Sequence, residues 1–274
     1  MLYQFLQMAY LQLYLIDIKL HIFDIMLGFI VRTLWLIWCW LELGVFTLSL
    51  YLLSWLPRPL IAGYYHYLFR VWCSFFVRAL GVELRLHEKN IDPIPKQFIL
   101  IANHPSALED VGIPTLFNVT VLAKAGVRKW WLVGRINYVA GTVFVKRDDP
   151  DSRRASVESL TNELRLGRNI ALFPEGGCRG RRIFSTFYSG AFEMSMRTGV
   201  PILPVFLHYE AQETFEWREP QTLIHKIWHF MTSLNDQANY YIYDIIDPDG
   251  YTDKHEFAES VRQKYLHWQE RYLE

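Results

Sequence analysis

The sequence predicts an α/β domain with a central mixed sheet flanked by helices, preceded by N-terminal membrane helices. Two observations predict it. The first quarter of the chain is almost continuously apolar, whereas the remainder alternates short apolar runs with longer stretches of helical periodicity. Buried strands that alternate with amphipathic helices are typical of α/β domains, and a long apolar run is typical of a membrane segment.

The composition narrows the classes of partner. The 274 residues carry 28 basic and 28 acidic side chains, and this zero net charge argues against a nucleic-acid partner. Tryptophan and tyrosine are abundant, with 10 and 16 residues, which is typical of proteins that meet a membrane interface. Cys39, Cys73 and Cys178 lack the spacing of a disulfide framework or a metal site, so the sequence predicts neither.

The first 81 residues are predicted to meet the membrane. Residues 33–56 contain a single charge, Glu42, and as a helix would be about 36 Å long, more than the roughly 30 Å hydrocarbon core of a bilayer. Because a charge within lipid is costly, we expect Glu42 to face a partner helix or to mark a re-entrant turn. Residues 60–81, after Pro57 and Pro59, mix aromatic residues with arginines and predict an amphipathic helix at the interface.

This pattern also predicts the domain boundaries. Residues 1–25 are apolar but interrupted by charges, and Met26 would open a tidy N-terminus, so the hypothesis for residues 1–25 is an upstream extension. Residues 26–81 are the predicted membrane-inserted and interfacial helices, and residues 82–274 the α/β domain. More arginines follow the apolar segment than precede it, which by the positive-inside bias favours a cytoplasmic α/β domain.

The elements of the α/β domain follow from its periodicity. Strands are predicted at the short apolar runs 97–102, 119–123, 142–146, 169–173 and 201–208. Helices are predicted at 151–166, at 189–197 and over the last 20 residues, an amphipathic segment that we interpret as structural. Asp151 and Ser152 would cap the first of these helices, and Gly167 would end it.

Polar segments lie where the predicted strands end. The first, Asn103 to Asp110 (NHPSALED), places His104 close to two carboxylates, Glu109 and Asp110. A histidine base needs an acid that fixes its tautomer, and this segment supplies both groups. A purely structural histidine is the alternative.

Three further segments follow at intervals. Phe173 to Arg182 (FPEGGCRGRR) combines glycines, which let backbone amides approach an anion, with three arginines that can hold phosphate; a turn with solvated charges is the alternative. Gly141 to Arg147 (GTVFVKR) ends a strand with two cations. Val200 to Val205 (VPILPV) is apolar and is predicted to line the core or a groove.

In this order and at these intervals, the four segments resemble those of the glycerolipid acyltransferase family, which includes bacterial 1-acyl-sn-glycerol-3-phosphate (lysophosphatidic acid) acyltransferases. The resemblance covers roughly residues 80–210 and implies a single acyltransferase domain. It implies that His104 is the base and that an acid of the same segment orients it. The preceding apolar segment also fits the family's N-terminal membrane motif.

The resemblance also implies which residues hold the acceptor. By it, Arg147, Glu175 and Gly176 bind the acceptor, and Lys124, which follows an alanine as in the family, contacts phosphate. The family usually has a lysine near the position where this chain has Tyr188. One phosphate-side cation is therefore absent, and we expect an arginine of the FPEGGCRGRR segment to replace it: Arg179, Arg181 or Arg182.

Another departure leaves the acid partner open. Where the family usually has aspartate this chain has Glu109, and Asp110 follows it. On a helix the two positions point about 100° apart, so we expect only one to face His104, with a slight preference for Glu109. The chain also has Gly177 and Cys178 where the family usually continues with threonine.

The resemblance implies a membrane-bound O-acyltransferase without a cofactor. It would move a fatty acyl group from acyl-CoA or acyl carrier protein to the free hydroxyl of a lysophospholipid. The most favoured acceptor is 1-acylglycerol-3-phosphate, which would give phosphatidic acid. Glycerol 3-phosphate or a lyso-aminolipid as acceptor stays open, as does a non-catalytic lipid-binding scaffold. Direct transfer needs no acyl-enzyme; Ser106 as a nucleophile is the rival, although no glycine elbow surrounds it.

Overall fold

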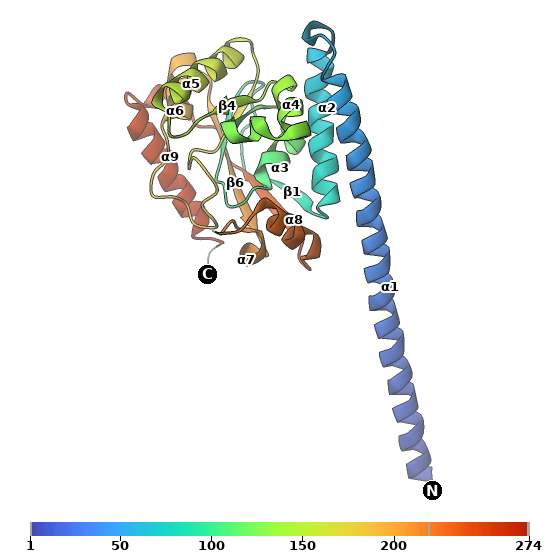
Figure 1. Ribbon diagram of the computed structural model, residues 1–274. Helices are drawn as coiled ribbons and strands as arrows, with labels where there is room; N and C mark the ends of the chain where they lie inside the picture. Colours follow the sequence, from blue (N-terminus) through green and yellow to red (C-terminus); the bar gives the residue numbers. More distant parts are fainter. Residues whose placement is uncertain (1, 219, 273–274) are drawn as a thin grey trace.

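Two N-terminal helices stand beside an α/β domain in this computed structural model, which describes residues 2–218 and 220–272 (Figure 1). α1 (Leu2–Leu53) is one long helix, and α2 (Arg58–Ala79) returns along its second half. Pro57 precedes α2 and Pro59 lies in its first turn, where a missing amide hydrogen costs nothing. α1 continues as helix past Met26, so no structural break separates the predicted extension from the segment that follows.

Glu42 faces a partner helix, the first of the two predicted alternatives. Its carboxylate forms an ion pair with Arg78 of α2, whose guanidinium also lies 4.5 Å from the ring centre of Phe75. The alternative of a re-entrant turn is wrong, because α1 is helical on both sides of Glu42. The pair satisfies both charges at a level where the outer face of α1 is apolar.

From His21 onward, the exposed surface of α1 is mostly apolar. Its His21–Leu53 stretch is long and apolar enough to cross a membrane, and it is the one such stretch that the described residues contain. From His21 to Val31 every side chain is exposed. Further along, the face toward α2 is buried, as at Cys39, Leu43 and Leu50. α2 is buried on the α1 side and on the domain side, more deeply than an interfacial helix requires.

A seven-stranded mixed sheet forms the centre of the domain, in the order β1-β7-β6-β2-β5-β3-β4. The strands are β1 (Glu83–Glu88), β2 (Ile99–Ala102), β3 (Thr120–Lys124), β4 (Val143–Val145), β5 (Ile170–Leu172), β6 (Ile202–Tyr209) and β7 (Gln237–Ile242). β7 runs antiparallel to β6, and the remaining pairs are parallel. All five predicted strands are therefore present, and β1 and β7 are additional.

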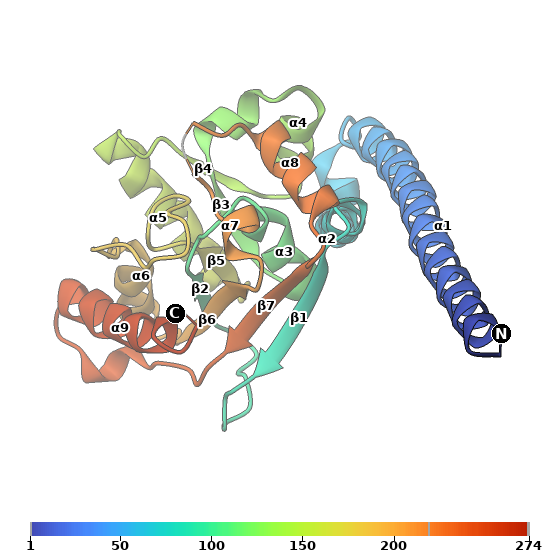
Figure 2. The same ribbon diagram turned by 90° about the horizontal axis from the view of Figure 1, so that it is seen from below.

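Helices cover both faces of the sheet (Figure 2). Packed with α2 against one face are α3 (Glu109–Leu116), α7 (Gln212–Phe215) and α8 (Leu223–Thr232). Packed against the other are α5 (Pro150–Arg165), α6 (Gly190–Thr198) and α9 (Lys254–Gln269). α4 (Trp131–Val139) packs against α1 and α2, and short 3₁₀ helices form at Ala125–Lys129 and Pro248–Gly250.

The helix ends follow local chemistry. α5 is capped by Asp149, which accepts from the amides of Asp151 and Ser152, so the predicted cap is displaced because Pro150 already occupies the first turn. Gly167 follows α5 with φ of 77°, as predicted. α9 ends at Gln269, earlier than predicted, and residues 273–274 lie outside the described part. Fully burying each of its core-facing aromatic side chains contributes about 1.5–3 kcal/mol.

The strand directions bring the predicted site residues to one edge. β2, β3, β4, β5 and β6 are parallel, so their carboxyl ends meet there. His104 follows β2, Lys124 ends β3, Arg147 follows β4 and Glu175 follows β5. Residues up to 71 positions apart in sequence therefore share one edge of the sheet.

Candidate active site

The loop after β2 is held in place by its backbone. The His104 amide donates to Glu175 Oε2 at 2.7 Å, and the His104 carbonyl accepts from the Arg179 amide at 3.0 Å. One residue earlier, the side chain of Asn103 bonds the amide and the carbonyl of Leu207 on β6, at 2.7 and 3.0 Å. The position of His104 is therefore set jointly by β6 and by the loop after β5.

The imidazole of His104 is paired with Glu109. Nδ1 lies 2.9 Å from Glu109 Oε2, which also accepts the Ser106 amide at 3.1 Å. The hydroxyl of Tyr209, at the end of β6, donates to the other carboxylate oxygen. His104 is 2% exposed and Glu109 is fully buried. Because the carboxylate accepts from Nδ1–H, Nε2 carries the lone pair that can take a proton.

Asp110 lies on the other side of the ring. Its Oδ1 is 4.0 Å from Nε2 of His104, and its side chain is 61% exposed. The expectation that only one carboxylate can face His104 is therefore wrong, because the ring has a nitrogen on each side. The preference for Glu109 as the partner of Nδ1 is met by this geometry.

A thiol and an aromatic ring complete the surroundings of the base. Sγ of Cys178 is 3.4 Å from Nε2 and donates to the Ser106 carbonyl at 2.9 Å. The ring of Phe173 stacks on the imidazole, with 4.0 Å between centroids. Phe173 thus covers one face of the imidazole. Nε2, at the edge of the ring, contacts the thiol of Cys178, which is small enough for a bound hydroxyl group to displace.

The surroundings decide the protonation of these groups. Burial alone would lower the pKa of His104, but Cys178, Glu109 and Asp110 outweigh burial and raise that pKa well above its ordinary value of 6.5. Burial, together with the Glu109 carboxylate, raises the pKa of Tyr209, so its hydroxyl keeps its proton and remains a donor.

Glu175 supports the loop that carries the base. It is 1% exposed, and its oxygens accept from the amides of His104 at 2.7 Å and Phe184 at 2.9 Å. Both carboxylate oxygens are therefore occupied by backbone donors. The direct contact between Glu175 and the acceptor stays a prediction, and in this structure Glu175 bridges two loops.

The glycines after Glu175 allow close approaches. Gly176 has φ of 72°, and a Cβ there would lie 2.3 Å from the ring of Tyr188, so both the backbone conformation and the space require glycine. A Cβ on Gly177 would lie 3.0 Å from a guanidinium nitrogen of Arg147. Arg147 is therefore brought beside the turn that carries Cys178, within reach of a group bound at His104.

Of the other predicted cations, Lys124 is exposed, whereas Arg179 and Arg181 have partners of their own. Lys124 is exposed at the end of β3, paired in register with Val145 of β4. The Arg179 guanidinium stacks on the ring of Phe184 at 4.0 Å. Arg181 is held by the carboxylate of Glu216 at 2.8 Å, so it does not replace the missing family cation. Among the described residues, no group of three or more histidine, cysteine, aspartate or glutamate side chains is placed to hold a metal ion.

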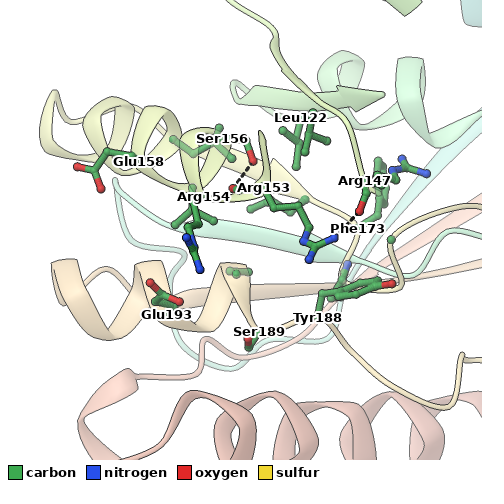
Figure 3. A pocket seen from close by; sticks show the side chains of 18 of the residues that line it. Leu122, Arg147, Arg153, Arg154, Ser156, Glu158, Phe173, Tyr188, Ser189 and Glu193 are labelled. Carbon is green, nitrogen blue, oxygen red and sulfur yellow. Dashed lines mark hydrogen bonds between the residues drawn. The ribbon is translucent and has the colours of Figure 1, made fainter. Parts of the chain in front are cut away.

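A cavity of about 510 Å³ lies between α5 and the loop after β5 (Figure 3). Its apolar lining includes Leu122, Val145, Val157, Leu160 and Leu172. The arginines that line it are Arg147, Arg153, Arg154 and Arg197. Arg153 reaches across the cavity from α5 and donates to the Arg147 carbonyl at 2.6 Å. His104 is not a lining residue, but Phe173, which stacks on it, is.

Three residues of the site had no predicted role. Tyr209 lies one position beyond the predicted strand 201–208, so a longer strand would have placed it at the catalytic edge. Phe173 and Cys178 belong to a recognised segment, yet nothing in the local pattern indicates that their side chains contact His104. These contacts depend on the parallel pairing of β2 with β5.

The fold and site together place the chain in the class of α/β domains that carry a buried histidine, paired with a carboxylate, at the carboxyl edge of the sheet. Within that class, residues 85–208 match the model of the family described as Acyltransferase. The matched residues include His104, Arg147 and Glu175.

Curated relatives and a solved structure are similar to the chain. The chain is 32% identical over 174 residues to a lyso-ornithine lipid O-acyltransferase of Pseudomonas aeruginosa, covering 61% of this chain and 66% of the relative. It is 25% identical to a 1-acyl-sn-glycerol-3-phosphate acyltransferase of Neisseria gonorrhoeae, covering 42% and 45%. The crystal structure of a 1-acyl-sn-glycerophosphate acyltransferase of Thermotoga maritima has the same fold, with a TM-score of 0.64, 20% identity, and 88% and 96% coverage. The chain thus spans less than two thirds of the length of either relative.

Proposed function

We propose that this protein is a membrane-bound O-acyltransferase that transfers a fatty acyl group from a thioester donor, acyl-CoA or acyl carrier protein, to the free hydroxyl of a lysophospholipid. The favoured acceptor is 1-acylglycerol-3-phosphate, with phosphatidic acid as the product. One observation carries the proposal: Glu109 accepts from Nδ1 of His104, which leaves the lone pair of Nε2 directed at the site edge.

In the proposed mechanism the acyl group moves directly. Nε2 of His104 takes the proton of the acceptor hydroxyl as its oxygen attacks the thioester carbonyl. Glu109 stabilises the imidazolium that forms, and the imidazolium then returns the proton to the departing thiolate as the carbon–sulfur bond breaks. Cys178 lies where the acceptor hydroxyl must arrive, so the acceptor displaces the thiol from Nε2.

The neighbouring residues are assigned by their positions. Arg147 lies beside the Gly177 turn and would bind the acceptor phosphate, as a guanidinium can do with two hydrogen bonds. Gly176 allows the turn, and Glu175 positions the His104 loop. Lys124 is exposed on the same edge and would attract an anionic headgroup from outside the site.

A second acceptor class is favoured by a specific observation. Tyr188 replaces the usual family lysine and closes on Gly176, so the site has one cation fewer for a phosphate. A lyso-aminolipid carries no phosphate and would not need that cation. The identity to a lyso-ornithine lipid O-acyltransferase points the same way.

Membrane attachment is part of the proposal. The apolar stretch His21–Leu53 of α1 would hold the chain at the bilayer, and the arginines that follow it favour a cytoplasmic active site. We retain the division into a possible extension at 1–25, membrane helices at 26–81 and a catalytic domain at 82–274.

A panel of acceptors tests the proposal. Purified protein in detergent is given acyl-CoA or acyl carrier protein thioester with 1-acylglycerol-3-phosphate, glycerol 3-phosphate or lyso-ornithine lipid, and esterified product is measured. We expect His104→Ala to reduce turnover at least a hundredfold, while His255→Ala on the exposed start of α9 leaves it unchanged. Near-normal turnover of folded His104→Ala would disprove the mechanism, and lipid binding without turnover would favour a scaffold.

A further inference from the structure

α8 and the turn after it expose large apolar side chains beside α1. Ile224 and Trp228 lie one helical turn apart and are 78% and 64% exposed. Leu234, just past the end of α8, is 99% exposed. A ridge of this kind on a short amphipathic helix is costly in water and needs an occupant.

The opposite face of α8 leads to the active site. Phe230 is buried against Phe215 of α7, with 4.9 Å between ring centroids, and Phe215 packs against Tyr209 at 5.0 Å. Tyr209 donates to Glu109, the partner of the base. In addition, the amide of Trp217, between α7 and α8, donates to the Pro105 carbonyl at 2.8 Å, one residue after the base. α8 therefore lies next to the carboxyl edge of the sheet.

The exposed ridge is continuous with the apolar part of α1. Arg32 of α1 donates to the Ser233 carbonyl at 3.1 Å and lies 3.7 Å from Asp236, so it holds the turn that carries Leu234. Immediately before Arg32, all side chains from His21 to Val31 are exposed and mostly apolar. Figure 1 shows α8 at the level where α1 begins to extend past the domain.

We infer that the ridge formed by Ile224, Trp228 and Leu234 enters the lipid bilayer interface beside α1. Aliphatic residues and tryptophan suit the boundary between headgroups and acyl chains, where amphipathic helices lie about 5–10 Å deep. The charged residue between Ile224 and Trp228, Lys226, is buried and donates to the Thr214 carbonyl at 3.0 Å, so it does not interrupt the ridge. A soluble protein partner would have to cover the adjoining surface of α1 as well. Docking of α8 on the bilayer brings the carboxyl edge of the sheet to the lipid surface, where a lipid acceptor would be found. In this respect the inference rests on the proposed function.

Spin labels test the location of α8 without requiring turnover. Trp228→Cys and Leu166→Cys are labelled with a nitroxide in the full chain in phospholipid nanodiscs, with unsubstituted protein as the background for the native cysteines. Leu166 is 67% exposed at the end of α5, on the other face of the sheet. For each label, the collision rate with oxygen is divided by the collision rate with a water-soluble nickel complex. We expect this oxygen-to-nickel ratio to be at least threefold higher for the label at 228 than for the label at 166. Equal ratios would overturn the inference.

Activity on two forms of acceptor supplies an independent test. Ile224→Glu combined with Trp228→Glu should lower acylation of a lysolipid embedded in vesicles at least fivefold, and of a short-chain monomeric lysolipid less than twofold. Leu166→Glu is the matched control and should change neither rate. Equal losses on both acceptors would contradict the inference. If the unsubstituted chain acylates neither acceptor, the proposed function fails, while the spin-label result still decides where α8 lies.

Discussion

Replacing Glu109 with glutamine tests the central contact of the site. Glu109→Gln keeps the length of the side chain and removes the charge that faces Nδ1 of His104 at 2.9 Å. The amide can still accept one hydrogen bond, but it offers only one oxygen where the carboxylate serves His104, Ser106 and Tyr209. The imidazolium of His104 then lacks a negative charge beside Nδ1. The carboxylate that kept the proton of neutral His104 on Nδ1 is also lost.

The expected magnitude follows from these losses. Removing the orienting carboxylate of a histidine base lowers turnover by up to about 10⁴-fold, and a positioned base contributes about 10²–10⁴-fold. We therefore expect kcat/KM to fall between about 10²- and 10⁴-fold, or roughly 3–5.5 kcal/mol of transition-state stabilisation. The free energy of unfolding should fall by only about 1–3 kcal/mol, because one buried hydrogen-bond partner is lost.

The matched control is the adjacent acid. Asp110→Asn removes a charge 4.0 Å from Nε2, but the side chain is 61% exposed and makes no bond to Nδ1. We expect less than about a tenfold loss of kcat/KM, because an exposed charge is largely screened. Steady-state kinetics with thermal denaturation of both variants checks the comparison. If Asp110→Asn were the more damaging change in folded protein, the assignment of Glu109 would be refuted.

Three further outcomes are expected. The pKa of His104 is raised, and the proposed base must be neutral to accept a proton. We therefore expect kcat/KM to rise with pH through an apparent pKa above 6.5. A pH–rate profile with its inflection below 6.5 would contradict this. Gly176→Ala should unfold at lower temperature and lose most activity, because its φ is 72° and the new Cβ meets Tyr188; unchanged melting and turnover would argue against this turn. Arg78→Ala should lower the free energy of unfolding by up to about 1 kcal/mol, because the ion pair with Glu42 is partly exposed, and adding Glu42→Gln should recover that loss in thermal melts; a larger loss in the double variant would contradict this.

The parts of the fold that were predicted from sequence share a strong local signal. The five parallel strands are short apolar runs, because both of their faces are covered by helices. β1 and β7 were not predicted, because ELRLHE and QANYYI mix polar and apolar residues at the less covered end of the sheet. Their pairing is established by contacts about 150 residues apart in sequence, which no local pattern reveals.

The same limit applies to the active site. His104, Glu109 and Arg147 could be predicted, because each lies in a segment whose order along the chain resembles a family. The bridging contacts of Glu175 could not be predicted, because no local pattern shows that two backbone amides donate to its carboxylate. The contact of Tyr209 with Glu109 joins residues 100 positions apart and depends on the sheet order.

The continuity of α1 has a mechanical consequence. α1 is a single helix without a proline or a break, and α2 and α4 pack on its second half. We therefore expect α1 and the domain to move together. Transmembrane helices tilt when their apolar length exceeds the local bilayer thickness. Any tilt of α1 in a thinner bilayer would therefore rotate the whole catalytic domain, and the orientation of its active site would depend on the thickness of the membrane that houses it.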